Sequence, residues 1–67
     1  MIIDKMKFDF LRAEQCLRIK DVLRNAECSK FVVQKINLGQ NLDPFTVGKI
    51  ARALNVSAAE IVVKKGG

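Results

Sequence analysis

The side chains of this sequence that can do chemistry are mainly cationic and amide groups. Three of them, Lys30, Gln34 and Lys35, lie close together in the sequence, and Phe31 lies between them. On a helix this spacing gathers the four side chains on one outward surface. Lysine can donate to O6 and N7 of guanine, glutamine can form two hydrogen bonds with adenine, and Phe31 can contact a thymine methyl. The alternatives are that the lysines form an ordinary solvated face and that Phe31 packs on the flank of its helix.

Catalytic chemistry lacks its usual residues. The sequence has no histidine, and its nearest acidic pair in this region, Asp21 and Glu27, is six residues apart and falls on different helical faces. It also has no glycine-rich loop that could hold a phosphate. We therefore predict that the protein is not an enzyme and that it holds no metal and no cofactor.

Cys16 and Cys28 are the only thiols of the chain. They lack the CxxC spacing and the histidines of a metal site, and a single disulfide is the alternative. The short apolar start is followed at once by Asp4 and Lys5, which is not the pattern of an export signal. We therefore expect reduced, partly buried thiols, a cytoplasmic location and no membrane span.

Apolar residues recur with helical spacing, which predicts an all-α protein with a single domain over residues 1–67. Ser29 is a good N-cap, Gly39 suits the left-handed residue that ends a helix, and Asp43 followed by Pro44 is typical of a helix start. Ser57 to Glu60 has the pattern of a capping box. The expected helices cover residues 8–15, 18–26, 29–38, 44–54 and 57–63.

The apolar faces of these helices define the expected core. Its predicted members are Leu11, Val22, Val33, Ile36, Val47, Ile50, Leu54 and Ile61. Phe8 and Phe10 are also expected to face inward, and Asn55 to cap the end of the fourth helix. Residues 1–7 are expected to form a lead-in that packs on the domain, and residues 64–67 to fray.

Only Glu27, Cys28 and Ser29 separate the second expected helix from the third. Because Ser29 restarts the helical pattern, the two helices must cross at an angle. A helix pair with so short a turn is typical of the helix-turn-helix, whose second helix enters the major groove of DNA. The spacing therefore predicts a DNA-binding protein that reads bases with its third helix.

The charge distribution agrees with this prediction. The net charge is +5, and residues 18–40 carry five basic and two acidic side chains, whereas residues 1–17 carry three of each. The excess of positive charge falls on the helix pair and the tail, as the neutralisation of DNA phosphates requires. The alternative is an ordinary basic surface. The predicted phosphate contacts are Arg18, Lys20, Ser29, Gln40 and Asn41.

Two stretches resemble the phage-repressor and Cro family, the xenobiotic-response-element type of helix-turn-helix. They are Ser29-Lys-Phe-Val-Val-Gln-Lys-Ile-Asn-Leu-Gly39 and Lys49-Ile-Ala-Arg-Ala-Leu-Asn-Val-Ser-Ala-Ala-Glu-Ile61. The first is similar to the family's recognition helix and closing glycine, and the resemblance covers roughly residues 8–63. It implies a five-helix, lambda-repressor-like DNA-binding domain. It also implies a sequence-specific regulator of transcription that binds double-stranded DNA, of the repressor type.

Three positions depart from the family pattern. Leu23 replaces a small alanine inside the second helix, Glu27 replaces the glycine of the turn, and Ile19 replaces a glutamine that touches the DNA backbone. Glu27 implies that the turn either avoids a positive φ or tolerates it at some cost in stability.

Ile61, Val62 and Val63 are consecutive β-branched residues in the last expected helix. A helix cannot turn all three toward one small core, so we expect this run to form a dimer interface. A homodimer would then read paired half-sites on DNA. The alternative is a protein-interaction module, such as an antitoxin or another partner-binding regulator.

Overall fold

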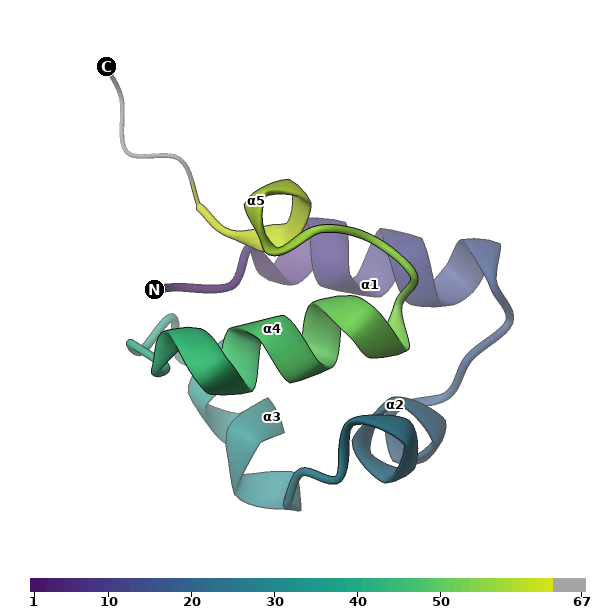
Figure 1. The fold of residues 1–67 in the computed structure, drawn as a ribbon, viewed down its shortest axis with the longest axis horizontal. Coiled ribbons are helices and arrows are strands. Elements are labelled where there is room, and N and C mark those ends of the chain that lie inside the picture. Colours follow the sequence, from purple (N-terminus) through teal and green to yellow (C-terminus); the bar gives the residue numbers. More distant parts are fainter. Residues whose placement is uncertain (64–67) are drawn as a thin grey trace.

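The computed structural model of this protein describes residues 1–63, most of which are helical (Figure 1). The helices are α1 (Lys5–Glu14), α2 (Ile19–Ala26), α3 (Lys30–Asn37), α4 (Pro44–Ala53) and α5 (Ala58–Ile61). The predicted all-α class is confirmed. Helices α2, α3 and α4 agree with the predicted ranges to within one residue at each end, whereas α1 begins earlier and α5 ends sooner than predicted.

Helix α4 is the central element of the fold. It contacts α2 and α5, while α1 contacts α5 and α2 contacts α3. In Figure 1, α2 and α3 lie on one side of α4, and α1 and α5 lie on the other. The pair of helices predicted to form the helix-turn-helix is therefore confined to one side of the molecule.

The predicted start of α1 at residue 8 is wrong, because Asp4 caps a helix that begins at Lys5. The Asp4 carboxylate accepts hydrogen bonds from the backbone N–H groups of Met6, at 3.0 Å, and Lys7, at 3.2 Å. An aspartate at this position satisfies amide groups that the helix itself cannot bond. The extra turn makes residues 5–7 part of the helix, so the lead-in ends at Asp4.

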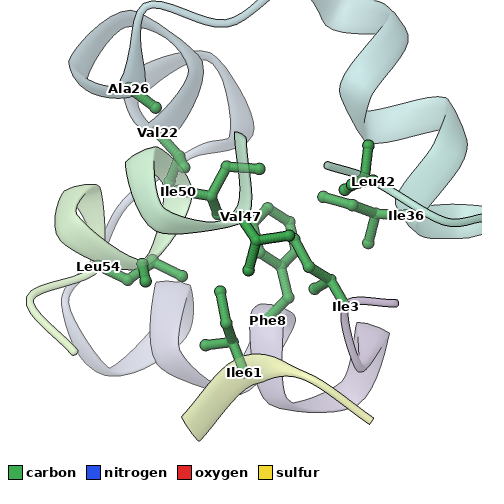
Figure 2. Packing of buried hydrophobic residues seen from close by; sticks show 11 residues of the cluster. Ile3, Phe8, Val22, Ala26, Ile36, Leu42, Val47, Ile50, Leu54 and Ile61 are labelled. Carbon is green, nitrogen blue, oxygen red and sulfur yellow. The ribbon is translucent and has the colours of Figure 1, made fainter. Parts of the chain in front are cut away.

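The core is built around one face of α4 (Figure 2). Its buried residues are Ile3, Phe8, Val22, Ala26, Ile36, Leu42, Val47, Ile50, Ala51, Leu54 and Ile61. Figure 2 shows the labelled side chains of the four longer helices, α5 and the lead-in converging on Val47. Six predicted core residues are confirmed as buried, and Leu11 packs against the cluster while remaining partly exposed.

Two inward-facing predictions are wrong. Val33 is only half-buried and lies outside the cluster, because α3 turns the line of Val32 and Ile36 toward the core. Phe10 is 68% exposed, because α1 turns Phe8 inward and a residue two positions further on a helix points away from the same face.

The first four helices end in a left-handed residue, and only one of these residues is glycine. The φ angles are 55° at Cys16, 55° at Glu27, 67° at Gly39 and 57° at Asn55. After α2, the N–H of Glu27 donates to the carbonyl of Arg24 at 3.2 Å, and that of Cys28 donates to Leu23 at 2.9 Å. This double hydrogen bond is the Schellman motif, and it compensates for the strain of a positive φ. The turn between α2 and α3 therefore tolerates Glu27 rather than avoiding the strain.

The predicted extension of the last helix to residue 63 is wrong. Helix α5 ends at Ile61, and Val62 has the extended angles φ −91° and ψ 151°. Val62 forms an antiparallel bridge with Ile3. β-branched side chains favour extended backbone, and the lead-in offers them a partner for it. The predicted fraying of residues 64–67 lies outside the described residues.

Cys16 and Cys28 are free thiols, the first exposed and the second half-buried against the core. Within residues 1–63, we find no helix with the length and apolarity needed to cross a bilayer.

Candidate nucleic-acid interface

Helix α3 presents a polar and basic surface opposite the residues it buries. Ile36 is 2% exposed and holds the helix against the core. All four predicted base contacts are exposed, and Phe31 retains 60% of its accessible surface, so it does not pack on the helix flank. Gln34 lies one turn beyond Lys30 and Phe31, and Lys35 lies beside it. The structure therefore gathers Lys30, Phe31, Gln34 and Lys35 on one exposed helical surface.

Ser29 precedes this surface and is the N-cap of α3, with φ −84° and ψ 164°. Its side chain makes no capping hydrogen bond, contrary to the usual role of a serine at this position. Ser29 is also exposed. Its hydroxyl group is therefore available to donate to an external acceptor such as a phosphate oxygen.

The other predicted phosphate contacts flank α3 along the chain. Arg18 and Lys20 are exposed at the start of α2, and Gln40 and Asn41 are exposed in the loop that follows α3. Asp21 accepts a hydrogen bond from the backbone N–H of Arg18 at 2.9 Å, which fixes the beginning of α2. Arg18 and Lys20 therefore lie with the start of α2, whereas Asn41 lines a shallow hollow together with Met1, Ile2 and Val63.

Most acidic side chains form hydrogen bonds or ion pairs within the domain. In addition to Asp4, three carboxylates accept hydrogen bonds from backbone amides at the starts of helices. These are Asp21 from Arg18 at 2.9 Å, Asp43 from Thr46 at 2.6 Å and Glu60 from Ser57 at 3.0 Å. The bond to Ser57 is one of the two that the predicted capping box requires. Because the amide of Thr46 donates to Asp43, the pKa of that carboxyl lies below its ordinary value, and the nearby charge of Lys35 contributes in the same direction.

Asp9 is occupied by two cations of its own helix. Its carboxylate pairs with Lys5 at 2.8 Å and with Arg12 at 2.7 Å, and these hydrogen bonds lower the pKa of Asp9. Within residues 1–63, these two contacts are the only ion pairs. On α2, α3 and α4 and at the N-cap of α2, the exposed basic side chains without an ion pair are Arg18, Lys20, Arg24, Lys30, Lys35 and Arg52, and the half-buried Lys49 also has none. This asymmetry leaves the positive charge of the helix pair available to an external anion.

The exposed surface of α4 was not among the predicted sites. Phe45 is 77% exposed, and the ammonium group of Lys49 lies 5.7 Å from the centre of its ring. Together with Pro44, Gly48 and Arg52, these residues line a shallow hollow. The spacing of Phe45, Lys49 and Arg52 matches a single helical face, so periodicity alone would have revealed it.

The residues predicted to form a dimer interface, Ile61 to Val63, pack largely against their own domain. Ile61 is fully buried in the core, and Val62 is half-buried beside Ile3. Val63 remains 43% exposed. Ile61 therefore cannot contact a second chain while the domain is folded, and only Val62 and Val63 retain accessible surface.

No cluster of three or more histidine, cysteine, aspartate or glutamate side chains that could hold a metal occurs in residues 1–63. Comparison with protein families, curated proteins and solved structures gives no match. The resemblance to the phage-repressor and Cro family therefore stays a prediction from the residues.

Proposed function

We propose that this protein is a sequence-specific regulator of transcription that binds double-stranded DNA, of the phage-repressor and Cro type, with α3 in the major groove. The observation that carries the proposal is the exposed surface of α3, where Lys30, Gln34 and Lys35 stand opposite the buried Ile36. A helix of this kind, fixed by a buried residue on one side, can insert its polar side between the phosphate strands.

Base reading in this proposal comes from α3. Lysine donors at positions 30 and 35 suit guanine O6 and N7, and the amide of Gln34 suits adenine. Phe31 contributes an apolar contact to a thymine methyl. Such contacts distinguish base pairs because the major groove presents a different pattern of donors and acceptors for each pair.

Affinity in this proposal comes mainly from the phosphates. The basic side chains without ion pairs on α2 and α3 replace counterions on the DNA, and the released ions make binding strongly dependent on salt. Ser29, Gln40 and Asn41 supply uncharged contacts that set the position of the helix on the duplex. The protein would then act as a homodimer in the cytoplasm, without a cofactor, on two half-sites.

The test is selection of bound sequences from a random duplex pool, using the full chain at two salt concentrations. We expect a recurring half-site motif, often in pairs about 10 bp apart or at a multiple of that spacing. Recovery of duplexes without any common motif would contradict sequence-specific reading. Failure to retain any duplex at low salt would contradict DNA binding altogether.

A protein-interaction role, for example that of an antitoxin, is the second candidate. It is favoured by two large apolar side chains that remain exposed, Leu38 at the end of α3 with 71% exposure and Phe45 near the start of α4 with 77%. Exposed aromatic groups are common centres of protein interfaces. A duplex mobility shift that weakens steeply with salt supports the DNA-binding function, whereas its absence favours the protein-interaction role.

A further inference from the structure

The outer surface of α1 is apolar, and the proposed DNA contacts do not use it. Met6 is 82% exposed and Phe10 is 68% exposed. Together with the exposed Ala13 they follow the spacing i, i+4, i+7, which places them in one line along the helix, away from the buried Phe8. A line of exposed apolar side chains on a helix is typical of a helix–helix interface.

Two opposite charges flank this line on the same side. Lys7 and Glu14 are seven residues apart, or about 10.5 Å along the helix axis, and Phe10 lies near their midpoint. Neither side chain forms an ion pair within residues 1–63, in contrast to Asp9 on the other flank, which two cations hold. The outer surface of α1 thus carries one unused positive charge near its start and one unused negative charge near its end.

We propose that a second copy of this chain binds to the line of Met6, Phe10 and Ala13, with its own α1 running antiparallel. A two-fold axis near Phe10 places Lys7 opposite Glu14 of the second copy and Glu14 opposite Lys7 of the second copy. The same axis stacks the two Phe10 rings and sets Met6 against Ala13 of the second copy. In a parallel arrangement the two-fold axis runs along the helices and sets Lys7 and Glu14 of the two copies on opposite edges of the interface, where they cannot pair with each other.

The surface beside Phe10 has room for such a contact. Lys7, Phe10, Leu11 and Glu60 line a shallow hollow between α1 and α5, into which an apolar side chain of the second copy can fit. A contact between two helices of ten residues is smaller than a standard interface of about 1,600 Å². We therefore expect a weak, concentration-dependent dimer rather than a permanent one.

This inference concerns self-association without DNA, so its success or failure is separate from that of the proposed function. The experiment is analytical ultracentrifugation of the full chain over a range of concentrations, with Lys7→Glu, Glu14→Lys and the double variant. Each single reversal places like charges opposite each other at both ends of the interface. A negative charge near the start of α1 and a positive charge near its end also suit the helix dipole, so neither variant should unfold the helix.

We expect each single variant to dimerise at least tenfold more weakly than the wild type. The double variant, and an equimolar mixture of the two single variants, should recover the dimer because opposite charges face each other again. Lys30→Glu makes the same charge change on α3 and should leave self-association unchanged, and circular dichroism should show equal helical content in all chains. A monomeric wild type at high concentration, or single variants that dimerise like the wild type, would overturn the proposal. Failure of both the mixture and the double variant to recover would overturn the antiparallel arrangement.

Discussion

Val62 and Ile3 form an antiparallel bridge that joins the two ends of the described chain. Two backbone hydrogen bonds flank the bridge: the N–H of Asp4 donates to the carbonyl of Ile61 at 2.7 Å, and that of Val63 donates to Ile2 at 2.8 Å. Ile3 and Ile61 are both buried at this junction. The short helix α5 is therefore held against the domain by backbone pairing as well as by its one buried side chain.

Replacing Val63 with proline should weaken this junction selectively. Proline removes the N–H that donates to Ile2, and it favours the extended conformation that Val62 already has. We expect a loss of about 0.5–1.5 kcal/mol in the free energy of unfolding, the usual contribution of one hydrogen bond. Urea denaturation measures the loss. Val63→Ala keeps the N–H and is the matched control, so equal stability of the two variants would contradict a role for this bond.

Truncation of the central core residue should unfold much of the population. Ile50 is 1% exposed on the face of α4 that the other helices cover, and Ile50→Ala leaves a cavity there. We expect a loss of about 2–5 kcal/mol, which is a large part of the stability of so small a domain. Thermal denaturation followed by circular dichroism tests this, with Phe31→Ala as an exposed control. An unchanged melting temperature for Ile50→Ala would contradict the observed packing.

Glycine in the turn between α2 and α3 should stabilise the protein. Glu27 has a φ of 55°, and a side chain in this conformation costs about 1–2 kcal/mol. Part of the relief is lost because glycine is more flexible in the unfolded chain, so we expect Glu27→Gly to gain up to about 1 kcal/mol. Glu27→Ala removes the same charge but keeps the strain, and it should show no such gain. A less stable glycine variant would contradict this explanation.

Acid should weaken the start of α4. The pKa of Asp43 is lowered in the folded state, mainly by the hydrogen bond from the Thr46 amide, so the unfolded chain binds a proton more readily. This contribution is therefore complete above the unfolded pKa of about 3.9 and is lost as the pH falls through the lower folded value. Asp43→Asn keeps a capping acceptor without the charge. Urea midpoints from pH 5 to pH 2 should fall less in this variant than in the wild type, and equal slopes would contradict the assignment.

Much of the fold could be predicted from local signals, and the exceptions have a common cause. Asp43, Pro44 and Gly39 act through their immediate neighbours, so the bounds of α3 and α4 followed closely from the sequence. The pairing of Ile3 with Val62 joins residues at opposite ends of the chain, and no local pattern indicates it. The early start of α1 was a different case, because Asp4 is a recognisable N-cap that competed with the interpretation of a lead-in.

The candidate site was predictable at the level of exposure but not of partners. Helical spacing correctly assigned Lys30, Gln34 and Lys35 to an exposed surface, since the position of Ile36 decides which side of α3 is buried. Which cations remain without an ion pair depends on where the carboxylates go. Asp9 is held by Lys5 and Arg12 at the helical spacings i, i+4 and i, i+3, so these pairs could be predicted once α1 is known to begin at Lys5.

Alanine substitution of the two lysines of α3 tests how the proposed DNA contact is made. If Lys30 and Lys35 reach base edges, each substitution should weaken binding to the selected sequence by about 1–3 kcal/mol and relax the preference at one base pair. If they reach only phosphates, all sequences should weaken alike and the salt dependence should become less steep. Lys5→Ala removes an equal charge from α1 and should have little effect. Fluorescence anisotropy with matched and scrambled duplexes measures both quantities, and a double alanine variant with unchanged affinity and specificity would rule out α3 as the reading helix.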